Sequence, residues 1–142
     1  MIGPMPVPLK VVLGPEPLDV ARLAAMRVPD SNQGAVVHFH GVVRGMEGGV
    51  PIWGLEYSAF ERMAHRQFGL LVAAAAGRWP VASVRIHHRL GPVRAGEVSL
   101  WVEVVAPHRA EAFALCPWII DEMKRVVPIW KRAVPLGRSA RG

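Results

Sequence analysis

The stretch "SVRIHHRLGPVRAGEVSLWVEVV" covers residues 83–105 and contains two runs of alternating side chains. Val84, Ile86 and His88 share one face of the first run with Leu90, because successive strand residues point to opposite sides. The run at 97–105 alternates in the same way, and "GPVRAG" (91–96) between them is typical of a hairpin connection. Residues 83–105 therefore predict two antiparallel strands.

Further elements are expected on both sides of this pair. In "GAVVHFHGVVR" (34–44), Ala35, Val37 and Phe39 fall on one strand face. Ser58 and Glu61 match a capping box, which predicts a helix start. The full set is strands at 7–13, 34–44 and 50–57, and helices at 16–26, at 58–77 and after 107–109. Strands joined by short turns favour one α+β domain with a mostly antiparallel sheet and flanking helices.

The last helix has an apolar stripe and a defined end. The stripe is Phe113, Cys116, Ile120, Met123 and Val127. Pro128 should end the helix, since a proline inside a helix loses a hydrogen bond and clashes with the preceding turn. Lys124 then lies before the break, and Lys131 is expected to approach the same place from a loop that Trp130 holds.

Composition limits the class of protein. The chain has 142 residues, 51% hydrophobic and 20% charged, enough to bury the core of one domain. Its net charge of +6 favours an anionic partner. One cysteine excludes an internal disulfide, and no uncharged apolar run reaches the roughly 18 residues of a membrane span. The prolines of "MIGPMPVPLK" are not typical of a signal peptide, so a cytoplasmic protein is expected.

Basic residues at the ends of elements are the candidates for an anion pocket. Arg44 ends a strand, and His108 and Arg109 precede or begin a helix, whose free N–H groups attract anions. Each also has a plainer interpretation, because lysines near a helix C-terminus and solvated arginines are common. Cys116 is interpreted as a buried thiol, the tryptophans as core or interface residues, and the histidines lack the further ligands of a metal site.

Four segments in a fixed order make the chain resemble a known family. They are "GAVVHFHGVVR", "LEYSAFERMA", "IHHRLGPVRAGEVSLWVEVVAPHRAEAF" and "IIDEMKRVVPIWKR". Together they resemble the large, catalytic subunit of molybdopterin synthase. The resemblance implies an α/β hammerhead-like single domain over residues 1–132. By composition, residues 133–142 are polar and basic, and they are expected to form a mobile tail.

The resemblance also implies an activity and an assembly. In that family a homodimer of large subunits binds two small ubiquitin-like subunits, which gives a heterotetramer. The small subunit's Gly-Gly tail carries a thiocarboxylate, whose sulfur is transferred to cyclic pyranopterin monophosphate to form the molybdopterin dithiolene. A sulfurtransferase of molybdenum cofactor biosynthesis, with no cofactor or metal of its own, is therefore expected.

The matching motifs carry the family's functional residues over to this chain. Lys124, Lys131 and Arg44 correspond to catalytic positions, with Lys124 beside the incoming tail. The substrate-binding set implied is Phe39, Val42, Val43, Arg44, His108, Arg109, Lys124, Lys131, Arg132 and Ala133. Arg109 and Lys124 are fifteen residues apart, about 22 Å along a straight helix. Either the helix bends, or His108 and Arg109 serve the pocket of the other subunit. The second is favoured because the resemblance implies a dimer.

Three departures leave alternatives open. Ala133 stands where the family usually has glutamate, the family's tryptophan-containing end is missing, and Pro117 should kink the last helix. The first two suggest a partner-binding scaffold with weakened catalysis as a second interpretation. A basic nucleic-acid module is a third, based on net charge alone and without the interleaved aromatic pattern of such proteins.

Overall fold

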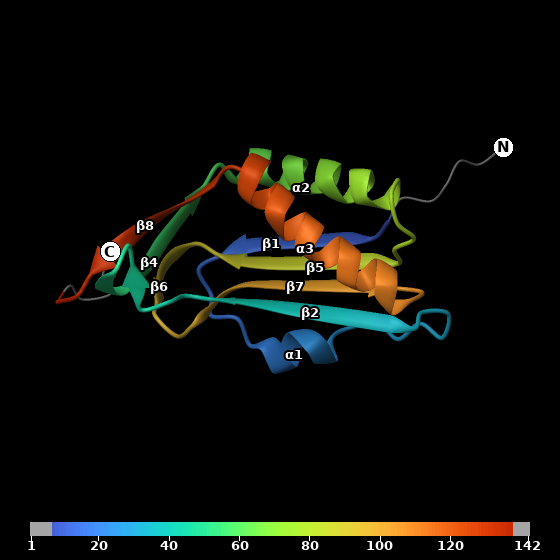
Figure 1. Ribbon diagram of the computed structural model, residues 1–142, viewed down its shortest axis with the longest axis horizontal. Coiled ribbons are helices and arrows are strands. Elements are labelled where there is room, and N and C mark those ends of the chain that lie inside the picture. Colours follow the sequence, from blue (N-terminus) through green and yellow to red (C-terminus); the bar gives the residue numbers. More distant parts are fainter. Residues whose placement is uncertain (1–6, 138–142) are drawn as a thin grey trace.

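The larger sheet has four strands in the order β1-β5-β7-β2 (Figure 1). The computed structural model describes residues 7–137. The strands are β1 (Leu9–Gly14), β2 (Ala35–Val42), β5 (Ser83–Arg89) and β7 (Val98–Ala106). β1 is parallel to β5, whereas β5 and β2 are both antiparallel to β7. The strand pair predicted from residues 83–105 is confirmed, with Ser83 opposite Val105.

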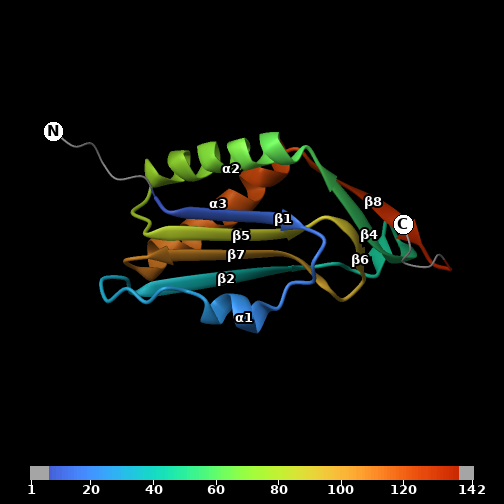
Figure 2. The same ribbon diagram turned by 180° about the vertical axis from the view of Figure 1, so that it is seen from behind.

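Helices cover both faces of this sheet. α2 (Glu61–Ala76) and α3 (Arg109–Val126) lie on one face, where Ile86, Val102 and Phe39 meet them in the main core. α1 (Val20–Ala25) lies on the other face, where the Arg85 side chain donates to the carbonyl of Leu23 at 2.8 Å (Figure 2). The alternation in the sequence therefore assigned the faces correctly for β2 and β5.

A second, smaller sheet lies beyond one end of the first (Figures 1 and 2). It contains β3 (Met46–Glu47), β4 (Val50–Ala59), β6 (Gly91–Arg94) and β8 (Ile129–Pro135). β4 pairs antiparallel with each of the other three strands. Gly48 and Gly49 have positive φ, which allows the tight turn between β3 and β4. The α+β class with mostly antiparallel pairing is confirmed.

Several local predictions are wrong. Ser58 does not cap α2, because it lies in β4 opposite Trp130, and Phe60 holds the cap position instead. Phe113 does not belong to the buried stripe of α3, since it is 63% exposed. α1 begins only at Val20, after Asp19, whose side chain accepts from the Arg22 N–H. The hairpin connection at 91–96 contains β6 rather than turn residues alone.

The C-terminal segment differs from the expectation in its first part. The predicted boundary between residues 132 and 133 falls inside β8, where Ala133 pairs with Leu55. Residues 138–142 lie outside the described part of the chain, so a tail there stays a prediction. Between residues 7 and 137, none of the helices is both long enough and apolar enough to cross a membrane.

Candidate active site

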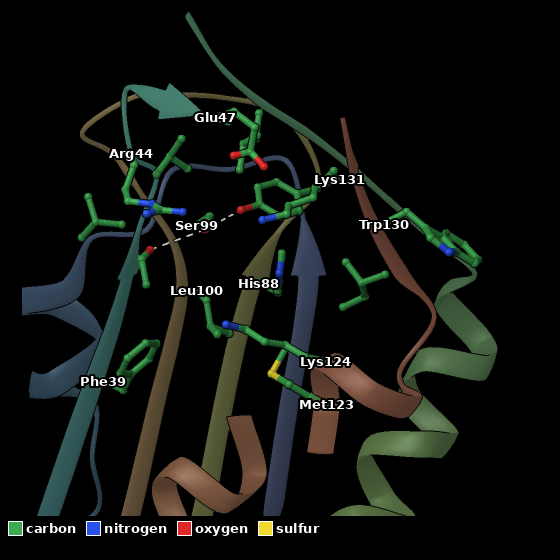
Figure 3. A pocket seen from close by; sticks show the side chains of 16 residues that line it. Phe39, Arg44, Glu47, His88, Ser99, Leu100, Met123, Lys124, Trp130 and Lys131 are labelled. Carbon is green, nitrogen blue, oxygen red and sulfur yellow. Dashed lines mark hydrogen bonds between the residues drawn. The ribbon is translucent and has the colours of Figure 1, made fainter. Parts of the chain in front are cut away.

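A pocket of about 570 Å³ lies where the two sheets and the end of α3 meet (Figure 3). Phe39 and Leu100 come from the larger sheet, Leu55 from the smaller one, and Met123 from α3. These apolar walls surround a few polar groups, which is the usual composition of a small-molecule site. Arg44, Lys124 and Lys131 line the same pocket, so the structure brings together the three residues proposed as catalytic.

Lys124 owes its position to the end of α3. The helix ends at Val126, and Val127 is extended with φ −80° and ψ 127°. A residue that precedes proline is restricted to this region, so Pro128 accounts for the stop. The predicted break is confirmed. The carbonyl of Pro128 then accepts from the Phe60 N–H at 3.2 Å, which ties the end of α3 to the start of α2.

Lys131 reaches the pocket from a strand, not from the loop that was expected. Residues 129–135 form β8, in which Lys131 lies opposite Tyr57 of β4. Trp130 packs edge-to-face on Phe60 with ring centroids 4.9 Å apart, which fits its expected part in holding this turn. Strand pairing therefore gives Lys131 a fixed direction toward the pocket.

Arg44 follows a β-bulge at the end of β2. The register of β2 against β7 shifts between Gly41 and Val42, and β2 ends at Val42. The Val43 N–H donates to the carbonyl of Glu97, so the chain stays close to β7 beyond the bulge. Phe39, Val42, Val43 and Arg44 all line the pocket, as the predicted substrate-binding set requires.

The remaining four predicted residues do not line this pocket. His108 and Arg109 lie at the start of α3, and Lys124 lies near its end. The Arg132 side chain forms an ion pair with Glu56 on the other face of β8. Ala133 packs against a small core of Val43, Ile52, Leu55 and Val93. Within one chain, the pocket therefore lacks these four.

Four polar lining residues were not predicted from the sequence: Glu47, Tyr57, His88 and Ser99. The Tyr57 hydroxyl lies 3.2 Å from the Ser99 hydroxyl, which lies 3.4 Å from the Gly41 carbonyl and donates to it. His88 was placed on the core-facing side of its strand by alternation, which was the only available signal. The pocket lies at the end of the core-facing side of β5, so His88, the last residue on that side, faces the cavity.

Two other predictions concern residues away from the pocket. Among residues 7–137, no group of three or more histidine, cysteine, aspartate or glutamate side chains could hold a metal ion. Cys116 is buried in the main core, and burial raises the pKa of its thiol to about 11. The interpretation of Cys116 as a structural thiol is therefore confirmed, because a protonated, buried thiol is a poor nucleophile.

A protein-family model described as "MoaE protein" matches residues 13–126, most of the chain. The chain belongs to the MoaE family. Among MoaE relatives, the molybdopterin synthase catalytic subunit of Nostoc is 43% identical over 117 residues, which cover 82% of this chain and 70% of that protein. The subunit of the same name from Pyrococcus abyssi is 37% identical over 126 residues, covering 89% of this chain and 84% of that protein.

Solved structures agree with this family assignment. The crystal structure of molybdopterin synthase from Staphylococcus aureus superposes with a TM-score of 0.79 at 30% identity, covering 91% of this chain and 92% of that one. A complex of subunits 1 and 2 of the molybdopterin-converting factor from Helicobacter pylori contains a chain with a TM-score of 0.67 at 25% identity, covering 92% and 90%. The fold described above is thus the MoaE fold.

Proposed function

We propose that this chain is the catalytic subunit of a molybdopterin synthase. It transfers sulfur from the thiocarboxylated tail of a small ubiquitin-like subunit to cyclic pyranopterin monophosphate. The observation that carries the proposal is the convergence of Arg44, Lys124 and Lys131 on one pocket, from three separate parts of the chain, in a member of the MoaE family.

The charge of the pocket suits this substrate and this donor. Arg44, Lys124 and Lys131 are cationic, and Glu47 is the one carboxylate among the lining residues. A phosphate and a thiocarboxylate are both anions, and each is stabilised by charge-assisted hydrogen bonds from such groups. Apolar walls exclude water and so strengthen these interactions.

We assign the following roles within this proposal. Lys124 lies beside the reacting carbonyl of the tail and stabilises the negative charge that develops there. Lys131 binds the substrate and assists proton transfer. Arg44 holds an anionic group of the substrate, and His108 and Arg109 of a second copy complete the phosphate site.

The partners follow from the same proposal. A Gly-Gly tail has no side chains, so it can enter a narrow pocket between two sheets. The Helicobacter pylori structure, a complex of two subunits, supports a heteromeric assembly, and we propose a homodimer of this chain within a heterotetramer. We assign the reaction to the cytoplasm, since a single buried cysteine needs no oxidising compartment.

Reconstitution tests the proposal directly. Purified protein, thiocarboxylated small subunit and cyclic pyranopterin monophosphate should yield molybdopterin, measured by the fluorescence of its oxidised derivative. We expect Lys124→Ala to lower the rate about 10²-fold or more, because it removes a charge from the reacting centre.

The matched control is Lys10→Ala. Lys10 is an exposed lysine of β1 that does not line the pocket, so its removal should leave the rate unchanged. Full activity of Lys124→Ala would contradict its role. If the wild-type protein binds the small subunit but forms no product, the chain is a scaffold with lost catalysis, and Ala133 becomes the first position to restore to glutamate.

A further inference from the structure

His88 is a buried polar residue of the pocket that the mechanism above does not use. It belongs to β5 and is 6% exposed. Figure 3 shows its ring among the lining side chains, between the labelled Lys124 and Lys131 in that view. The ring packs edge-to-face on Tyr57 of β4, with centroids 4.8 Å apart, which restricts its rotation.

The hydrogen bonding of His88 determines which ring nitrogen carries the proton. Nδ1 lies 2.7 Å from the Arg89 carbonyl, and a carbonyl only accepts, so Nδ1 is the donor. Burial lowers the pKa of His88 below 6.5, and the bond to Arg89 offsets part of that effect. A neutral ring with a proton on Nδ1 has a lone pair on Nε2. In the described part of the chain the ring makes no second hydrogen bond.

The proposed reaction needs a proton acceptor. Once the sulfur of the tail has bonded to a substrate carbon, tail and substrate are joined through a thioester. The tail must leave as a carboxylate, so its carbonyl carbon has to gain an oxygen from water. As the new C–O bond forms, the C–S bond breaks, its electron pair stays on sulfur, and the water gives up a proton. No oxidation or reduction occurs in this step.

The other titratable lining groups are less suited to accept that proton. Arg44 only donates hydrogen bonds, and Lys124 and Lys131 are already assigned to the reacting carbonyl and to the substrate. The Tyr57 hydroxyl is already hydrogen-bonded to the Ser99 hydroxyl. Glu47 belongs to the short hairpin strand β3, in the smaller sheet. His88 alone combines a fixed ring, a neutral state and a lone pair inside the pocket.

We propose that His88 is a catalytic residue of this site: its Nε2 accepts the proton of the water that hydrolyses the thioester between tail and substrate. The inference rests on the proposed function, since it names the base for one step of that reaction. The imidazolium then returns its proton to the departing sulfur or to solvent, which restores the neutral ring.

Two substitutions separate this role from a structural one. In His88→Asn the amide N–H can still donate to the Arg89 carbonyl, but nothing replaces Nε2. In His88→Gln a polar group approaches the position of Nε2 without acting as a base. We expect both variants to form product about 10²-fold more slowly, the typical contribution of a general base. Both should accumulate the small subunit as a covalent adduct with the substrate, seen by intact mass after acid quenching, and hydroxylamine should cleave that adduct.

Each outcome decides the proposal. Wild-type turnover in either variant that binds the small subunit would overturn it, as would slow turnover without adduct. Adduct accumulation in Glu47→Gln instead of the His88 variants would assign the base to Glu47. Absence of product from the wild-type protein would refute the proposed function itself. If the wild-type protein and the His88 variants are all active, only the assignment of His88 as the base is refuted.

Discussion

Gly54 shows how one missing side chain allows the smaller sheet to form. It lies in β4 opposite Arg94 of β6. A Cβ atom built at this position would lie 2.1 Å from the Val93 carbonyl oxygen and 2.9 Å from the Arg94 Cα. Both contacts are with backbone, which cannot move aside as the end of a flexible side chain could. The close approach of β4 and β6, and hence one wall of the pocket, therefore requires glycine.

We expect Gly54→Ala to lower the free energy of unfolding by about 3 kcal/mol, at the upper end of overpacking costs. Gly69→Ala is the matched control, since Gly69 is an exposed position inside α2 with no atom within 4 Å of a new Cβ. That substitution should stabilise the protein by up to about 1 kcal/mol, because alanine favours the helix. Urea denaturation measures both. Equal midpoints for Gly54→Ala and wild type would refute the steric argument.

The α1-facing side of the larger sheet contains a buried ionic network. Glu103 of β7 is 1% exposed and accepts two hydrogen bonds from Arg85 of β5, at 2.7 and 2.8 Å. His38 of β2 lies 2.8 Å from the same carboxylate through Nε2. The three side chains connect three neighbouring strands, and the Arg85 guanidinium also covers the Trp101 ring at 4.8 Å. The register of β2, β7 and β5 is therefore specified by charge as well as by apolar packing.

This network predicts loss of stability in acid. Burial alone raises the pKa of the Glu103 carboxyl, but hydrogen bonds from Arg85 and His38 outweigh it and hold that pKa below 4.5. A carboxyl whose pKa is lower in the folded state than in the unfolded state stabilises the fold at every pH above its unfolded-state pKa. That contribution is lost as the pH falls through the folded-state pKa.

We expect Arg85→Ala to destabilise the protein by about 3–5 kcal/mol at pH 7, because it leaves a buried carboxylate without its main partner. The difference from wild type should shrink as the pH falls through the lowered folded-state pKa of Glu103, because the carboxyl then loses its charge. Arg125→Ala, which breaks an exposed pair with Glu122 on α3, should change stability little at any pH. Thermal unfolding from pH 3 to 8 distinguishes the two. A pH-independent effect of Arg85→Ala would mean that packing, not charge, dominates there.

The assembly of the molecule decides whether the proposed phosphate site is complete. Figure 1 shows α3 crossing the larger sheet, with its C-terminal end next to the smaller sheet and its N-terminal end away from it. Arg109 begins this helix, and Lys124 lies in its last turn. At 1.5 Å per residue the separation is about 22 Å, too long for one small ligand. If both residues bind the same substrate, they come from different copies.

Mixed dimers test this arrangement. When Arg109→Ala and Lys124→Ala subunits are combined in equal amounts, half of the dimers are mixed, and each mixed dimer regains one intact site. We therefore expect about a quarter of wild-type molybdopterin formation, well above either variant alone. The control is a mixture of Lys124→Ala and Lys131→Ala, whose defects lie in the same pocket, and it should regain nothing. No recovery in the first mixture would show that Arg109 serves no neighbouring site.

Local rules in the chain already determine a large part of this fold. Alternation assigned the core faces of residues 35–42 and 83–89, because strand geometry fixes the direction of each side chain. Pro128 predicted the end of α3, since proline restricts its own φ and the residue before it. The order of motifs predicted the family and, with it, Lys124, Lys131 and Arg44.

Other features depend on partners that are distant in the chain. Residues 129–135 become a strand only by pairing with β4, 70 or more residues away, and the same pairing removes Ser58 from the helix cap. Phe113 fits the helical period, but among residues 7–137 no element covers its position on α3, and it stays exposed. The pocket joins residues from β2, β4, β5, β7, α3 and β8, and the cavity wall at His88 exists only because these elements meet. Short-range geometry therefore determined the elements and their faces, whereas long-range pairing and packing decided β8, the pocket and the polar groups inside it.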